Sequence, residues 1–102
     1  MYTLITCANS AQAYTLKNKL PGELVIMGDF EALPEFLVNS GKMIRLPNPI
    51  ETSYIHQILA LCLDRNVNKI CPLRAQEQVL LLNSAQLFAE YGISILVDDQ
   101  IQ

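Results

Sequence analysis

The stretch YTLITCANSAQAY, residues 2–14, decides the fold because it joins a buried strand to a turn and a helix start. From Tyr2 to Cys7 it mixes apolar and β-branched residues without the alternation of a half-solvated strand. A strand of this kind is covered on both faces, which is typical of the centre of a parallel sheet. Asn9 is the expected N-cap of the next helix, with Gln12 reaching back to its amide. The chain is therefore predicted to open as strand, turn and helix.

The turn after this strand is also the first candidate binding site. In open parallel sheets, ligands bind outside the carboxyl ends of the strands, where the amides of helix N-termini carry partial positive charge. We therefore expect Asn9, Ser10 and Ala11 to lie near any small ligand of this protein.

Strands and helices are predicted to alternate along the rest of the chain. Strands are expected at residues 23–30, 43–46, 68–73 and 93–97, a single helical turn within 32–42, and helices at 49–66 and 75–91. Right-handed crossovers then give an α/β fold: an open, mainly parallel five-stranded sheet with helices on both faces, Rossmann-like, in the order 3-2-1-4-5. All 102 residues are expected to form one domain.

Two helix boundaries rest on specific residues. Asn48 is the predicted N-cap of the helix at 49–66, with Pro49 at its first position. In the last helix, Leu81, Ala85 and Phe88 recur at helical spacing and should face the core, and Leu82 and Ala89 should widen that stripe. Gly92 is the expected left-handed stop.

Composition and charge exclude several classes of function. The net charge is −3 and the seven Lys and Arg are dispersed, so no basic stripe is present to bind a nucleic-acid backbone. No apolar run approaches the ~20 residues of a membrane helix, and the first residues do not resemble a signal peptide. We expect a cytoplasmic protein that binds neither nucleic acid nor membrane.

The cysteines and the single histidine form no recognisable site. Cys7, Cys62 and Cys71 are odd in number and widely spaced, which argues against a disulfide framework and a zinc site. Cys62 and Cys71 are predicted to be small buried apolar residues. His56 has no ligating or nucleophilic residue at suitable spacing and is predicted to lie on the surface.

Polar groups at two further carboxyl-end loops are candidate ligand contacts. Asp29 follows the second strand, about twenty residues after the first turn, where dinucleotide-binding folds place a ribose-binding acid. It is either such a contact or an ordinary turn acid. Arg74 and Glu77 stand three apart at a helix start, and either form a solvated pair or face a zwitterionic or phosphate-bearing ligand. No catalytic residue and no metal site are predicted, since no complete catalytic motif is present.

The order of these segments resembles a known family. The series LITCANSAQAYTLKNKL, ELVIMGDF, MIRLPNP and KICPLRAQEQVLLL is similar to the N-terminal, pre-ATP-grasp domain of ATP-grasp ligases, especially the carbamoyl-phosphate-synthase-like and pyrrolysine-synthesis-like proteins. Pro72 and Glu77 match the family pattern, whereas Ala75 stands where the family tends to have an acid. The first turn also lacks the glycines of many relatives. The resemblance covers nearly the whole chain.

The resemblance implies a substrate-binding domain that is not catalytic on its own. Relatives form an acyl phosphate from a carboxylate and ATP, which an amine or similar nucleophile then attacks. ATP and Mg²⁺ would be held by a downstream ATP-grasp domain or subunit of a longer protein. In this chain, Asn9 and Ser10 would donate to substrate oxygens, and Glu77 would orient a cationic group or a water. An apolar surface left without its partner domain would favour homo-oligomers.

Two alternatives remain open. The chain could be a small phosphocarrier similar to the cysteine-bearing subunits of the sugar phosphotransferase system, because Cys7 directly follows the first strand, where those subunits carry a nucleophilic cysteine. It could also be a standalone ligand-binding module.

Overall fold

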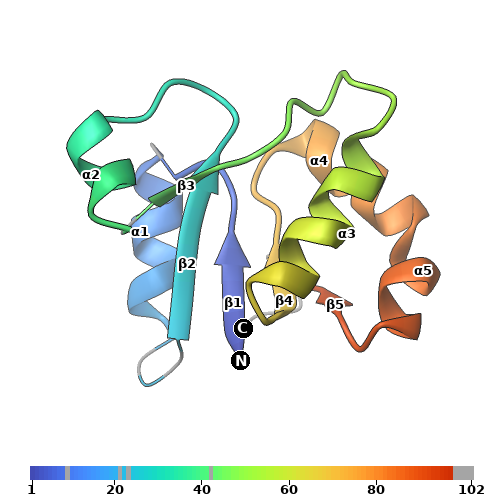
Figure 1. Cartoon of the computed structure of the whole chain (residues 1–102). Helices are drawn as coiled ribbons and strands as arrows, with labels where there is room; N and C mark the ends of the chain where they lie inside the picture. The colour runs from blue at the N-terminus through green and yellow to red at the C-terminus, as the bar shows by residue number, and fades with distance from the viewer. Residues whose placement is uncertain (9, 21, 23, 42, 98–102) are drawn as a thin grey trace.

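Five parallel strands form one sheet in the computed structural model, which describes residues 1–97 except 9, 21, 23 and 42. Along the sheet the order is β3-β2-β1-β4-β5, and every neighbouring pair is parallel. Figure 1 shows β1 near the middle of the molecule. The strands are β1 (Tyr2–Ile5), β2 (Leu24–Asp29), β3 (Met43–Arg45), β4 (Val67–Cys71) and β5 (Ser94–Ile95). The predicted α/β fold and strand order are confirmed.

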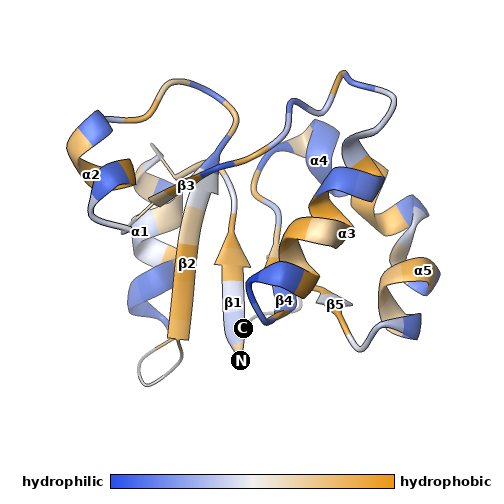
Figure 2. Cartoon of the chain, in the orientation of Figure 1, coloured by the Kyte–Doolittle hydropathy of each residue, from blue (hydrophilic) through white to orange (hydrophobic). Residues whose placement is uncertain are grey.

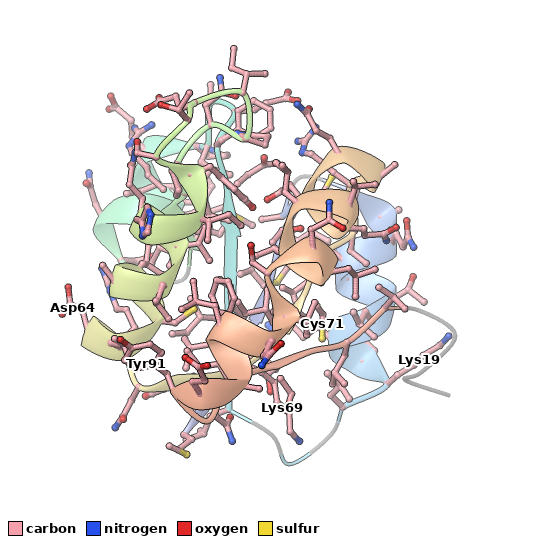
Figure 3. The ribbon with its side chains drawn as sticks, turned by 90° about the vertical axis from the view of Figure 1, so that its right-hand side faces the viewer. Lys19, Asp64, Lys69, Cys71 and Tyr91 are labelled. Atoms are coloured by element: carbon pink, nitrogen blue, oxygen red, sulfur yellow. The ribbon has the colours of Figure 1, made fainter. Side chains whose placement is uncertain are left out.

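Helices cover both faces of this sheet. They are α1 (Ala11–Asn18), α2 (Glu35–Asn39), α3 (Tyr54–Asp64), α4 (Ala75–Asn83) and α5 (Ala85–Glu90). One core cluster contains residues of α3, α4 and α5, and a second contains residues of α1. Figure 3, a side view, shows α1 and α3 on opposite sides of the strands. No described helix has the length and apolar character needed to cross a membrane.

The central strand is buried on both sides, as its sequence predicts. Leu4 packs into the cluster that contains Ile58 and Phe88, and Ile5 packs into the cluster that contains Leu16. Leu4 and Ile5 are each 0% exposed, and each fully buried side chain of this size contributes about 2 kcal/mol. Figure 2 shows the apolar colour of the lower part of β2 and of the upper part of β1. Burial on both faces therefore fixes β1 between the two helix layers.

Gly28 controls how closely β2 and β3 pack. A Cβ atom at this position would lie 2.9 Å from the carbonyl oxygen of Ile44 and 2.9 Å from Cγ of Leu46. The Gly28 carbonyl also accepts the amide of Ala8, which follows β1. The glycine thus allows the close approach that sets the position of the next residue, Asp29.

The predicted start of the third helix is wrong. Asn48 Oδ1 accepts the amide of Ile50, and its carbonyl accepts the amide of Glu51, so Asn48 closes a local turn. The helix α3 begins only at Tyr54. Asparagine readily bonds its own backbone two residues on, and here that turn competes with helix capping.

The segment 75–91 is two helices rather than the single one predicted. The chain breaks at Ser84, whose amide bonds the carbonyl of Leu81 and whose side chain makes no cap to α5. Leu81 and Phe88 face the core as expected, but Leu82 and Ala89 are exposed. The break ends the continuous stripe, and serine favours such interruptions because it lowers helix stability.

Several local predictions are confirmed. Within residues 32–41 the only helix is the five-residue α2. Gly92 has φ +77° and its amide bonds the carbonyl of Ala89, as a left-handed stop requires. Cys62 and Cys71 are buried, and His56 is exposed.

Candidate functional site

The loops that follow β2 and β4 meet through a buried ion pair. Asp29 is the last residue of β2, and Arg74 lies 45 residues further on, just before α4. Nη2 of Arg74 donates to Oδ1 of Asp29 at 2.8 Å and to Oδ2 at 3.0 Å. The Asp29 side chain is 1% exposed and that of Arg74 is 24% exposed. Two of the three predicted candidate loops are therefore joined by a charged contact.

Asp29 has a second hydrogen bond that fixes its carboxylate. Oδ1 also accepts the amide of Glu31 at 3.3 Å, which is the local turn geometry expected of an acid after a strand. The carboxylate is thus a turn acid, and it is also the partner of Arg74. Both of its oxygens are engaged by protein groups.

The guanidinium of Arg74 is held on several sides. Besides Asp29, its Nη1 contacts Oε1 of Glu31 at 2.9 Å, and its Cζ lies 4.6 Å from the centroid of the Phe30 ring. Burial lowers the pKa of Arg74, but the hydrogen bond and charge of Asp29, together with the charges of Cys7 and Glu31, raise it above its ordinary value. Arg74 is therefore a fixed cation.

Glu77 is buried, whereas a solvated Arg74–Glu77 pair would require it to be exposed. Its side chain is 2% exposed, and its Oε2 accepts a 2.6 Å hydrogen bond from the phenol of Tyr54. Its Oε1 lies 3.6 Å from Nε of Arg74, and neither of these two atoms has a hydrogen-bond partner among the described residues. Arg74 and Glu77 thus form a buried, stretched ion pair, and the solvated alternative is wrong.

The pKa values of both Glu77 and Tyr54 are raised in this part of the structure. Burial raises the pKa of Glu77, and the charge of Asp29 adds to this, while Tyr54, Arg74 and Thr6 oppose it. Burial also raises the pKa of Tyr54, as do its hydrogen bond to Glu77 and the charge of Glu77. The two groups therefore favour a state in which the phenol keeps its proton.

Thr6 joins the end of β1 to the same region. It is 0% exposed, and its Oγ1 accepts the amide of Leu73 at 2.9 Å. We call Thr6, Asp29, Tyr54, Arg74 and Glu77 the carboxyl-end cluster.

Tyr54 and Thr6 were not among the predicted site residues. Tyr54 could have been identified from the sequence, because it lies on the core-facing side of a helix and a buried phenol hydroxyl needs a hydrogen-bond partner.

The β1 loop uses Ser10, not Asn9, to cap α1. The Ser10 hydroxyl donates to the carbonyl of Cys7 at 2.8 Å and accepts the amide of Ala13 at 3.1 Å. The prediction of Asn9 as N-cap is therefore wrong, because the capping geometry falls one residue later; Asn9 itself lies outside the described residues. Ala11 is the exposed first residue of the helix.

Several amides of this loop already have protein acceptors. The amide of Ala8 bonds the Gly28 carbonyl, that of Ser10 bonds the Cys7 carbonyl, and that of Ala13 bonds the Ser10 hydroxyl. A loop that binds phosphate needs free amides directed at the ligand. These three amides are therefore not available to a phosphate.

Cys7 precedes Ala8 at the start of the β1 loop and lies within electrostatic range of Arg74. It is partly buried, has φ 56°, and its charge contributes to the raised pKa of Arg74. A positive φ is uncommon outside glycine, and here the Ser10 hydroxyl stabilises it by bonding the Cys7 carbonyl. The loop therefore turns sharply at Cys7.

Comparison with known proteins assigns no family. No protein-family model matches the chain, and no curated protein matches it either. The functional argument therefore rests on the geometry of the carboxyl-end cluster.

The composition of the cluster limits which polar groups it could hold. Arg74 is its cation, and three carboxyl groups, from Asp29, Glu31 and Glu77, surround it. No three His, Cys, Asp or Glu gather as a metal site in the part of the chain that the structure describes. The residues present do not fit Mg²⁺, since both oxygens of Asp29 are engaged by Arg74.

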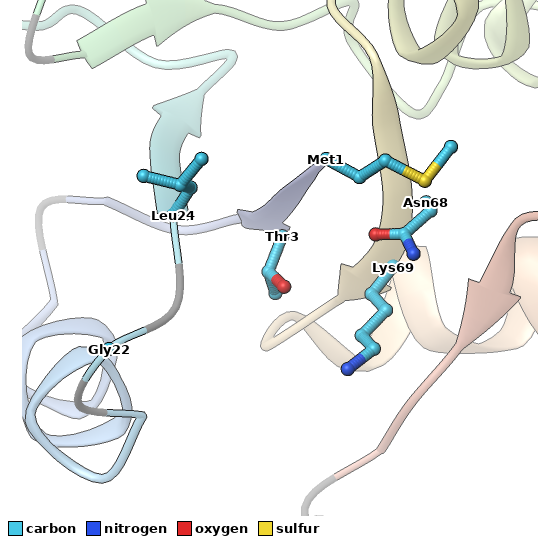
Figure 4. A pocket seen from close by; sticks show the side chains of 6 residues that line it. All are labelled: Met1, Thr3, Gly22, Leu24, Asn68 and Lys69. Carbon is cyan, nitrogen blue, oxygen red and sulfur yellow. The ribbon is translucent and has the colours of Figure 1, made fainter.

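A hollow of about 310 Å³ lies at the opposite, amino end of the strands. It is lined by Met1, Thr3, Gly22, Leu24, Asn68 and Lys69 (Figure 4). Its polar groups come from β1 and β4, at the end away from the cluster. We place the candidate site at the carboxyl end, because buried charged groups converge there.

Proposed function

We propose that this chain is the substrate-binding domain of a carboxylate–amine ligase of the ATP-grasp type, and that it is not catalytic on its own. One observation carries the proposal: Asp29, at the end of β2, meets Arg74 and Glu77, which follow β4, at the carboxyl ends of these strands. In sheets of this topology that end is where ligands bind. A cytoplasmic location, a downstream ATP-grasp domain or subunit, and self-association belong to the same proposal.

The role of this chain in the reaction is to hold a substrate, not to transfer atoms. In a ligase of this class, a substrate carboxylate oxygen attacks the γ-phosphorus of ATP and ADP leaves. An amine then attacks the acyl carbon, phosphate leaves and a proton is released. The fixed guanidinium of Arg74 would orient the polar end of the substrate, since a preorganised donor loses little freedom on binding.

ATP and Mg²⁺ would bind outside this chain. The amides of Ala8, Ser10 and Ala13 have protein acceptors, which disfavours phosphate binding by the described part of the β1 loop. The carboxylate of Asp29 is engaged by Arg74. We therefore expect calorimetry to detect no micromolar binding of Mg-ATP to this chain, and no ATP hydrolysis by it.

The direct test is made on the native protein. An antibody against this domain should detect a species several times heavier than 11.4 kDa, or a complex with a second subunit. The captured protein should release ADP from ATP only when a carboxylate substrate and an amine are both supplied. A free species of 11.4 kDa with no bound subunit would contradict the proposal.

A second candidate is phosphocysteine transfer by Cys7. The observation that favours it is the position of Cys7, at a sharp turn after β1 and within electrostatic reach of Arg74. The amides of Ala8 and Ser10 argue against phosphocysteine transfer, because they already bond protein carbonyls and cannot hold a phosphoryl group. Phosphoenolpyruvate-dependent labelling that disappears in Cys7→Ser would support this function and replace the ligase proposal.

A further inference from the structure

Arg74 contacts one exposed carboxylate, that of Glu31, in addition to two buried carboxyl groups. Towards the interior, the guanidinium meets Asp29 and Glu77, whose side chains are 1% and 2% exposed. Its Nη1 instead meets Glu31, whose side chain is 57% exposed. The same cation is therefore bound by two buried carboxyl groups and one carboxylate in solvent.

The inner contacts keep the guanidinium in place without Glu31. Nη2 bonds both oxygens of Asp29, and the Phe30 ring lies 4.6 Å from Cζ. Since Asp29 also accepts the amide of residue 31, the buried carboxylate is itself fixed. A donor held in this way presents Nη1 in one orientation whether or not Glu31 stays in contact.

The Glu31 contact is the one most easily exchanged. Ion pairs between exposed groups gain little free energy, because water and salt screen the charges and the side chain loses rotamer freedom. Breaking the buried contacts of Arg74 would instead leave a desolvated charge unpaired. An incoming ligand would therefore displace Glu31 first.

We infer that Nη1 of Arg74 is a docking point for the carboxylate of a small acid, and that Glu31 is an internal competitor that occupies this point when no ligand is bound. The inference rests on the proposed function, because it names the group of the substrate that this domain binds.

The charge of the cluster favours a carboxylate over a phosphate. Glu31 already places a carboxylate oxygen 2.9 Å from Nη1, so a ligand carboxylate repeats an existing contact. Asp29 and Glu77 add negative charge nearby, and a dianionic phosphate would be repelled more strongly than a monoanionic carboxylate.

The test is a titration of this chain with propionate, followed by ¹H–¹⁵N NMR at Nε–H of Arg74 and at the amides of Phe30 and Glu31. Glu31→Gln should bind propionate about two- to fivefold more tightly than the unaltered chain, as loss of an exposed competing ion pair implies. Glu90→Gln is the matched control: it removes one negative charge from an exposed site at the end of α5 and should leave the affinity unchanged. Inorganic phosphate should bind more weakly than propionate.

The outcomes separate this inference from the proposed function. If Glu31→Gln binds propionate no more tightly than Glu90→Gln does, Glu31 is not a competitor for this site. Tighter binding of phosphate than of propionate overturns the carboxylate assignment. Because ADP release by the native protein is measured separately, the ligase proposal could stand when the Glu31 inference fails, and the inference could stand for a non-ligase domain.

Discussion

Tyr54 and Glu77, 23 residues apart, are joined by a buried hydrogen bond of 2.6 Å. Tyr54 is the first residue of α3 and Glu77 lies in the first turn of α4, and each is 1% exposed. The bond fixes the carboxyl group beside Arg74 from a neighbouring helix. The orientation of the candidate site thus depends on a residue that is almost completely buried.

Replacing Tyr54 by Phe should destabilise the fold by about 1–3 kcal/mol, because Oε2 of Glu77 would lose its donor in a buried place. The pKa of Glu77 should also rise further, since this hydrogen bond lowers it. Urea denaturation measures the first effect and a ¹³C NMR titration of the Glu77 carboxyl measures the second. Tyr14→Phe, at an exposed position of α1, should change neither. An unchanged Glu77 pKa in Tyr54→Phe would contradict the assigned role.

Replacing Arg74 by Met should cost about 3–5 kcal/mol, because Asp29 would stay buried without its partner. Adding Asp29→Asn to this variant should recover part of the loss, since the unpaired charge is then removed. Chemical denaturation of the two single variants and the double variant gives the coupling energy directly. Arg65→Met, at the exposed end of α3, should lie within about 0.5 kcal/mol of the unaltered chain. Additive losses at positions 29 and 74 would show that the pair is not coupled.

The sheet could be predicted because its signals are local and agree with one another. The unalternating run from Tyr2 to Cys7 predicts a strand covered on both faces, and the chirality of crossovers then leaves few topologies. Leu4 and Ile5 are indeed buried in opposite core clusters. The predicted start of the third helix was wrong because Asn48, a possible N-cap, instead bonds the amide of Ile50 in a local turn. The last helix was predicted as continuous, although the chain breaks at Ser84.

The location of Asp29 and Arg74 at the carboxyl end of the sheet was predictable, but their contacts were not. Sequence spacing placed Asp29 and Arg74 at the same end of the sheet, and the structure brings them within 2.8 Å. The burial of Glu77 depends on Tyr54, which is distant in sequence, so no local pattern at 74–77 could reveal it. Exposure at a helix start is the ordinary expectation for an Arg and Glu three apart, and tertiary packing overrides it here.

Replacing Gly28 by Ala should destabilise the fold by about 1–3 kcal/mol through overpacking between β2 and β3. The added Cβ would lie 2.9 Å from the carbonyl oxygen of Ile44, which as backbone cannot move aside alone. Gly41→Ala is the comparison, because Gly41 has φ +80° and open space around its Cβ position. It should lose about 1 kcal/mol through backbone strain alone. NMR shifts at Ile44 and Leu46 should change in the Gly28 variant and not in the Gly41 variant; the reverse pattern would refute the steric explanation.

Stability should fall in alkaline solution because of Cys62. Burial raises the pKa of this thiol from 9.0 to about 12. A thiol whose pKa is higher in the folded than in the unfolded state stabilises the fold fully below pH 9.0, and this contribution is lost as the pH rises towards the folded value. The loss approaches about 1.4 kcal/mol per pH unit within that window.

Urea denaturation between pH 9 and 10 separates the contribution of Cys62 from that of Tyr54, because the phenol of Tyr54, whose pKa burial also raises, adds its own loss only above its ordinary value of 10.0. Cys62→Ala should lower stability at neutral pH by leaving a small cavity, yet its stability should decline less steeply from pH 9 to 10 than that of the unaltered chain. Cys7→Ala, at the partly buried cysteine, serves as control and should keep the steeper decline. If Cys62→Ala declines as steeply as the unaltered chain, another group is responsible for the alkaline loss, and the buried thiol is not the source.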